Sequence, residues 1–171
     1  MILIKKVLKI FALLISILLV IVLFLVYYQY NNYKKLESVE INNFGVEIIP
    51  FTLSNSGHIL ISVKINDDDT VYPFILDSGA SNIIFKNKLS EFQFENSGLG
   101  IGKGANGNYF LTDIKKIERL NIKKISFKNF NVNEVEHNFD CFDDYYGIIG
   151  LGLMHNLNWQ IDFNNQEVIV T

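Results

Sequence analysis

Residues 74–81, FILDSGAS, lead three apolar residues directly into a carboxylate that is followed by small residues. A buried strand rarely ends on a residue such as Asp77 unless the carboxylate is presented to something, because burying an unpaired charge is costly. Gly79 allows a sharp turn beside the aspartate, and the small Ala80 and Ser81 leave room for a second chain or a substrate. An ordinary strand followed by an Asx turn is the alternative, since Asp-Ser-Gly also favours that turn. The stretch alone leaves both interpretations open.

The N-terminal segment is strongly apolar. Residues 10–28 (IFALLISILLVIVLFLVYY) are long enough to span about 30 Å of hydrocarbon as a helix. Tyr27, Tyr28 and Tyr30 lie where an interfacial aromatic belt is expected. The alternative is a cleaved signal peptide, but its apolar core would be unusually long and no small-x-small cleavage site follows. We therefore expect an uncleaved transmembrane anchor.

The distribution of lysines around this segment predicts its orientation. Lys5, Lys6 and Lys9 precede the apolar run, and Lys34 and Lys35 follow it. Basic residues favour the cytoplasmic side of a membrane, and more of them precede the span. We expect a single-pass protein whose C-terminal part is extracytoplasmic, either periplasmic or extracellular.

Composition bounds the remaining chain. We expect an anchor at 1–30, a polar stalk at 31–40 and one domain at 41–171. The formal net charge is −3 and the lysines are scattered among acidic and apolar residues, so no nucleic-acid partner is expected. Cys141 is the only cysteine, which excludes an internal disulfide and leaves an idle thiol or a disulfide across a dimer. The acidic residues at 140–144 fit a solvated loop or a selector of basic substrates.

Apolar alternation and turn residues predict an all-β domain with one or two short helices. Strands or strand-like runs are expected at 44–51, 59–65, 71–76, 82–85, 92–94, 108–114, 115–120, 122–127, 130–135, 159–163 and 167–170. The strands at 59–65 and 71–76 form a hairpin that delivers Asp77. Its turn holds three aspartates but lacks the glycine and distal glutamate of an EF-hand, which favours a solvated turn. One or two helical turns are expected at 86–92 and a short helix near the end of 147–154.

Several motifs fit other chemistries poorly. Residues 102–107 (GKGANG) match G-x-G-x-x-G, but a strand-like run follows, so no helix N-terminus is available for a phosphate. Lys103 precedes Gly104 rather than Ser or Thr, which excludes a Walker A loop. We interpret the glycine-rich stretch 97–107 as a mobile hairpin able to open and close over a cleft.

Carboxylate chemistry remains. His58, His137 and His155 show no metal-type spacing, and no G-x-S-x-G supports a serine triad, so neither a metal nor a cofactor is expected. Two carboxylates about 3 Å apart can share one proton and activate a water for attack on a peptide carbonyl. The chain has one aspartate, Asp77, in such a setting. A second copy would have to supply its partner, which predicts a two-fold homodimer with the site on its axis.

FILDSGAS resembles the Asp-Thr/Ser-Gly-Ala signature of the retropepsin-type aspartic proteases. Three further segments resemble this family in the expected order: 97–107 its glycine-rich flap, 145–154 (YYGIIGLGLM) the apolar-apolar-Gly element before its helix, and 158–170 (NWQIDFNNQEVIV) the C-terminal hairpin of bacterial single-domain relatives. The resemblance covers about residues 59–170. It implies a retropepsin-like closed β-barrel, which corresponds to one half of an acid protease.

The resemblance also implies roles for individual residues. Asp77 would be the catalytic aspartate, and the Ser78 hydroxyl would hydrogen-bond across the dimer axis. Gly79 and Ala80 would let the two active-site loops approach each other closely. The residues bracing the Asp77 loop from behind would be Ile148, Ile149 and Gly150, and the flap glycines would be Gly100, Gly102, Gly104 and Gly107.

The implied substrate is an extended peptide, held beneath the flap by main-chain hydrogen bonds like an added strand. We therefore expect a membrane-anchored, homodimeric aspartic endopeptidase. One alternative is a non-catalytic domain of the same fold that binds peptides or partners at the cell envelope. Another is a structural anchor protein in which Asp77 belongs to an ordinary turn.

Overall fold

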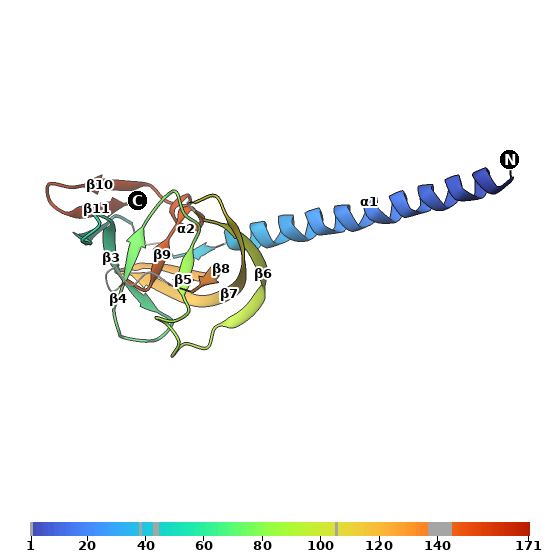
Figure 1. Cartoon of the computed structure of the whole chain (residues 1–171). Helices are drawn as coiled ribbons and strands as arrows, with labels where there is room; N and C mark the ends of the chain where they lie inside the picture. The colour runs from blue at the N-terminus through green and yellow to red at the C-terminus, as the bar shows by residue number, and fades with distance from the viewer. Residues whose placement is uncertain (1, 38, 43–44, 105, 137–144) are drawn as a thin grey trace. The chain divides into compact units, whose positions relative to one another are not determined.

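The computed structural model describes residues 2–37, 39–42, 45–104, 106–136 and 145–171. The chain divides into two compact units, Met1–Lys34 and Lys35–Thr171. Helix α1 (Ile2–Glu37) contains the apolar segment Lys6–Asn31, whose mean hydropathy peaks at 3.3 (Figure 1). A helix of this length and composition near the N-terminus fits either a membrane span or a signal sequence. Because α1 continues to Glu37, most of the expected stalk is helical.

The second unit is built mainly of β-strands. They are β1 (Glu40–Ile41), β2 (Glu47–Leu53), β3 (Ile59–Ile65), β4 (Tyr72–Leu76), β5 (Ile83–Phe85), β6 (Glu95–Lys103), β7 (Tyr109–Ile122), β8 (Ile125–Val135), β9 (Gly147–Ile149), β10 (Trp159–Asp162) and β11 (Glu167–Val170). One short helix, α2 (Leu151–Met154), follows β9 directly. The all-β prediction with a short helix is therefore confirmed.

The strands form one continuous sheet that closes on itself. Its order is β10-β11-β2-β3-β4-β9-β5-β8-β7-β6, and β1 pairs with β8. An additional pairing between β3 and β7 joins Lys64 to Asn121 and Ile65 to Leu120. This pairing closes a ring that runs β3-β4-β9-β5-β8-β7, which is the expected barrel (Figure 1).

The barrel encloses an aliphatic and aromatic core. Alternate residues of β2 and β3 point inward, as period-two patterning requires. The largest fully buried side chains are Ile49, Ile61, Ile65, Phe74, Ile84, Ile114, Ile117, Leu120, Ile122, Ile125, Phe127 and Phe130. The core thus draws on strands from the whole length of the second unit.

Strand boundaries in the middle of the domain differ from the prediction. The separate strands expected at 108–114 and 115–120 are one long strand, β7. The expected strand at 122–127 is wrong, because the chain turns at Lys123 between β7 and β8 with a positive φ of 51°. The strand expected at 130–135 is the second half of β8. Two basic residues in sequence carry no conventional turn signal, which is why the pattern did not reveal this hairpin.

The segment between β5 and β6 also differs. Residues 86–92 form turns, with a single helix-type bond from Leu89 N to Phe85 O (3.0 Å), and no helix. One turn does not propagate because helix nucleation is costly in so short a segment. The run expected as a strand at 92–94 is irregular, and the rings of Phe92 and Phe94 stack 5.5 Å apart against the core.

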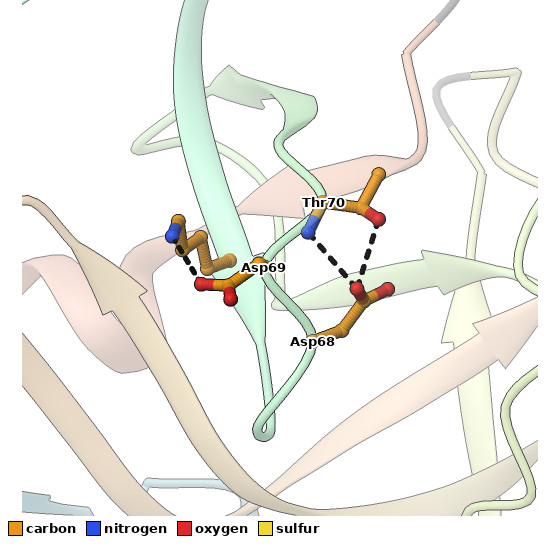
Figure 2. Close-up of polar contacts among 4 residues, drawn as sticks. Asp68, Asp69 and Thr70 are labelled. Carbon is orange, nitrogen blue, oxygen red and sulfur yellow. Dashed lines mark hydrogen bonds and ion pairs between the residues drawn. The ribbon is translucent and has the colours of Figure 1, made fainter.

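Asp68 and Asp69 of the β3–β4 turn make separate polar contacts (Figure 2). Asp68 accepts hydrogen bonds from the Thr70 backbone N (2.9 Å), the Thr70 hydroxyl (2.8 Å) and the Tyr72 hydroxyl (2.6 Å). Asp69 pairs with Lys64 at 2.8 Å. The bonds from Tyr72 and Thr70 lower the pKa of Asp68, while burial and the bond to Asp68 raise the pKa of Tyr72 to about 12. This polar turn holds the start of β4, the strand that leads to Asp77.

Candidate active site

Asp77 is the first residue after β4 and belongs to a tight turn. Its Oδ1 accepts the Gly79 backbone N–H at 2.8 Å, and its carbonyl oxygen accepts the Ala80 N–H at 3.2 Å. This is an Asx turn, so that part of the alternative interpretation is correct. Asp77 is nevertheless half-buried between exposed Ser78 and Gly79 and the buried strand before it. The turn orients the carboxyl group at the surface of the domain.

Strand β9 packs against the loop that runs from residue 77 to residue 82, called the Asp77 loop below. It lies between β4 and β5, parallel to β4 and antiparallel to β5. Ile149 is paired with Leu76, and its carbonyl oxygen accepts the Asp77 N–H at 3.0 Å. The loop therefore crosses the end of β9 from one neighbouring strand to the other. The two segments lie together only because the parallel pairing joins residues more than 70 positions apart.

Gly150 is packed directly under the same loop. A Cβ atom at this position would overlap the backbone of Ala80 and Ser81, so only glycine fits. The next residue, Leu151, donates its N–H to Ala80 O at 2.8 Å. Ile149 and Gly150 thus lie against the Asp77 loop. Ile148 also belongs to β9, where it pairs with Ile75 and Ile83.

Asn82 ends the loop and was not singled out in the sequence. Its side chain is buried, with 4% exposed, and its Oδ1 accepts the Gly150 N–H at 2.9 Å. Its carbonyl oxygen accepts the Asn133 N–H at 3.0 Å. Asn82 therefore ties the loop both to the β9–α2 junction and to β8. A signal existed in the sequence: the asparagine follows FILDSGAS immediately.

Asn133 and Thr112 extend this network to the β6–β7 hairpin. Asn133 Nδ2 donates to Ser81 Oγ at 3.2 Å, and the Thr112 hydroxyl donates to Asn133 Oδ1 at 2.8 Å. Both Asn133 and Thr112 are buried. The sequence carried no signal for a buried Asn133, because the alternation of asparagine with apolar residues in FNVNEV predicts asparagines on the solvent face of a strand.

The glycine-rich stretch forms a hairpin, but the glycines occupy two different settings. Gly100 and Gly102 lie within β6, opposite Thr112 and Phe110 of β7. Gly104 and Gly107 form the tip, where the Gly107 N–H donates to Gly104 O at 2.9 Å and Gly107 has a φ of 82°. The segment after the tip is a strand, as expected, so the stretch does not lead into a helix as a dinucleotide loop does.

The histidines within the described residues make short-range contacts. His58 Nδ1 lies 2.7 Å from Ser56 Oγ, and His155 Nδ1 lies 2.9 Å from Leu151 O. No group of three or more potential metal-binding side chains occurs among the residues that the structure describes. His137, Cys141 and the acidic segment 140–144 lie outside that part of the chain.

The structure thus places Asp77 at the end of a strand, next to a parallel neighbouring strand and linked by hydrogen bonds to the glycine-rich hairpin. A family model described as aspartyl protease matches residues 61–153, which is more than half of the chain. The chain therefore belongs to the aspartyl protease family. The matched region contains Asp77, Asn82, Asn133 and Gly150.

A solved structure shows the same fold. The crystal structure of a retropepsin-like aspartic protease from Rickettsia conorii matches with a TM-score of 0.51 and 21% sequence identity. The match covers 78% of this chain and 93% of the Rickettsia chain. A search of curated proteins found no match. The retropepsin-like fold expected from the sequence is confirmed.

Proposed function

We propose that this protein is an aspartic endopeptidase whose active site pairs Asp77 with the Asp77 of a second copy. The observation that carries the proposal is the Asp77 loop, in which the carboxyl group is oriented by Gly79 and braced by Ile149 and Gly150. Family membership supports proteolysis as the reaction class. One domain with one such aspartate requires a partner, which supports a homodimer.

The chemistry follows from two carboxyl groups that share one proton. The ionised aspartate takes a proton from a water molecule, whose oxygen attacks the peptide carbonyl carbon. The protonated aspartate donates a hydrogen bond to the carbonyl oxygen as negative charge develops there. Collapse of the tetrahedral intermediate breaks the C–N bond, and the amine leaves with a proton from the dyad. Ser78 supports the pair through a hydroxyl bond across the two-fold axis.

The substrate is an extended peptide that lies between the Asp77 loop and the β6–β7 hairpin. Gly79 and Ala80 keep the two loops close, while Gly100, Gly102, Gly104 and Gly107 belong to the hairpin that covers the peptide. Main-chain hydrogen bonds hold such a peptide in the manner of an added strand.

We also propose that residues 1–30 anchor the protein in a membrane, with 31–40 as the connection and 41–171 as the protease domain outside the cytoplasm. The length and apolar character of α1 and the distribution of lysines support this arrangement. Anchoring two copies in one bilayer raises their local concentration and so favours the dimer.

The first experiment measures peptide cleavage by the full chain in detergent. Asp77→Asn is expected to reduce kcat/KM by roughly 10²–10⁴-fold because the amide cannot act as a general base. The asparagine Oδ1 can still accept the Gly79 N–H, so the loop geometry is retained. Asp67→Asn is the matched control, since Asp67 pairs with Arg119 at an exposed turn and is expected to leave cleavage unchanged. Undiminished cleavage by Asp77→Asn would refute the proposed mechanism.

A mixing experiment tests the shared site. With equal amounts of wild-type and Asp77→Asn chains, random pairing leaves about a quarter of the dimers with two aspartates. Cleavage per wild-type chain should therefore fall to about half. Cleavage that depends only on the amount of wild-type chain would exclude the shared site. If both proteins bind peptides equally and neither cleaves them, the domain is a non-catalytic peptide-binding module instead.

A further inference from the structure

A partly buried hydrogen-bond relay joins the β6–β7 hairpin to the Asp77 loop. It runs from the Thr112 hydroxyl to Asn133 Oδ1 (2.8 Å) and from Asn133 Nδ2 to Ser81 Oγ (3.2 Å). The backbone N–H of Asn133 continues the link by donating to Asn82 O at 3.0 Å. A single side chain on β8 thus contacts both the hairpin and the loop that carries the aspartate.

The direction of each bond in the relay follows from the chemistry of the groups. The amide oxygen of Asn133 can only accept, so the Thr112 hydroxyl donates its proton to it. The amide nitrogen can only donate, so Ser81 Oγ accepts from it. Because both ends of the Asn133 amide are used, rotation of the side chain would break both contacts. A displacement of either the hairpin or the loop would therefore alter a hydrogen bond of the Asn133 amide.

The packing around Gly100 preserves this relay. Gly100 lies opposite Thr112 in the hairpin register. A Cβ atom on Gly100 would lie 2.9 Å from Thr112 Oγ1, 3.1 Å from Asn133 Oδ1 and 3.3 Å from Ile114 Cγ1. Such contacts are tighter than most side chains tolerate, so a larger residue would displace one member of the relay. Close packing, rather than mobility, accounts for glycine at this position.

The loop is held at both ends. At its start, Asp77 N–H is bonded to Ile149 O, and at its end Asn133 engages Ser81 and Asn82. A change at Asn133 would therefore alter the path of the loop without removing any atom that contacts substrate. Within the relay, Thr112 is the residue of the hairpin that contacts Asn133.

We propose that Asn133 is a positioning residue that couples the β6–β7 hairpin to the orientation of Asp77, with Thr112 as its contact on the hairpin. The proposal rests on the proteolytic function proposed above. When the hairpin settles on a bound peptide, the relay transmits its position to the Asp77 loop. The coupling acts on the catalytic step rather than on peptide affinity.

The test compares Thr112→Val with Thr112→Ser in the full chain. Valine keeps the size of threonine but removes the hydroxyl, whereas serine keeps the hydroxyl. We expect Thr112→Val to lower kcat roughly tenfold with little change in KM, and Thr112→Ser to restore kcat to near the wild-type value. Thr52→Val, on the exposed face of β2, is the matched control and should change neither constant. Equal losses in Thr112→Val and Thr112→Ser would show that packing alone is responsible, which would overturn the proposal.

Hydrogen exchange gives a readout that does not depend on turnover. The amides of Asp77, Gly150 and Leu151 are each bonded across the loop, to Ile149 O, Asn82 Oδ1 and Ala80 O. We expect faster exchange of these amides in Thr112→Val than in the wild type or in Thr112→Ser. Unchanged exchange would refute the coupling.

The two readouts separate failure of this proposal from failure of the proposed function. If the wild type cleaves peptides but Thr112→Val has normal kcat and exchange, the coupling is absent and the protease function stands. If no peptide is cleaved but exchange at the loop depends on the Thr112 hydroxyl, the coupling stands and the proteolytic function fails.

Discussion

Replacing Asn82 by alanine should lower the free energy of unfolding of the domain, because it removes a buried hydrogen-bond acceptor. Asn82 Oδ1 is the acceptor for the Gly150 N–H, and both residues are buried. Leaving a buried donor without an acceptor costs about 1–3 kcal/mol. The cost lies at the low end of this range if a water molecule fills the space of the lost amide and accepts the Gly150 N–H. For a domain of this size, each kcal/mol lowers Tm by roughly 3–5 °C.

Fluorescence of Trp159 provides the assay. This residue is the only tryptophan of the chain, and its Nε1 donates to the carbonyl oxygen of Met154, the last residue of α2, at 3.0 Å. Its signal therefore reports on the second unit and not on α1. Denaturant unfolding of the full chain in detergent should show a lower midpoint for Asn82→Ala with an unchanged m-value.

The control is Asn156→Ala. Asn156 is also an asparagine near α2, but it is exposed and donates to Gly152 O at 3.1 Å. Its replacement is expected to change the free energy of unfolding by less than about 0.5 kcal/mol. If Asn82→Ala is as stable as Asn156→Ala, the Asn82–Gly150 bond does not stabilise the loop and the reasoning is refuted.

Three further predictions concern the same domain. The pKa of Asp68 is lowered from its ordinary value of 3.8, so the ionised carboxylate stabilises the fold above pH 3.8, and this contribution is lost as the pH falls through the lowered pKa. Asp68→Asn should therefore be less stable than the wild type at neutral pH and equally stable in acid, as measured by urea unfolding. Because burial raises the pKa of Tyr72 from 10.0 to about 12, stability should fall across that interval in urea titrations, and Tyr72→Phe should remove the slope. Gly150→Ala should cost about 1–3 kcal/mol in the Trp159 assay because its Cβ overlaps the loop backbone. Wild-type stability of that variant would show that the loop can move aside.

Local patterns predicted the outline of the fold. Alternation in ILISVKI and the polar residues that follow it placed the β3–β4 hairpin and Asp77 at its end, because both depend on neighbours in sequence. The glycine-rich hairpin and the short helix after Gly150 were predicted for the same reason. The hairpin at Lys123 was missed because its turn residues are not those that usually mark a turn.

The candidate site was predicted only in part. The resemblance pointed to Asp77, Ile149 and Gly150, and the structure brings these three residues together. Asn82 and Asn133 complete the loop, but neither was predicted. Asn82 is distinguished only by its place directly after FILDSGAS, and the alternation around Asn133 is typical of a solvated asparagine.

The apolar strand that ends on Asp77 and the long apolar helix before the domain could both be predicted, because both are properties of consecutive residues. The contacts that hold Asp77 in place depend instead on residues that are far apart in the sequence. The bond from Gly150 to Asn82 joins residues 68 positions apart, and that from Asn133 to Ser81 joins residues 52 apart. Such contacts exist only once the closed sheet aligns its strands. The tertiary structure also shows that a Cβ atom on Gly100 would lie 2.9 Å from Thr112 Oγ1 and 3.1 Å from Asn133 Oδ1, so the glycine leaves room for these two side chains.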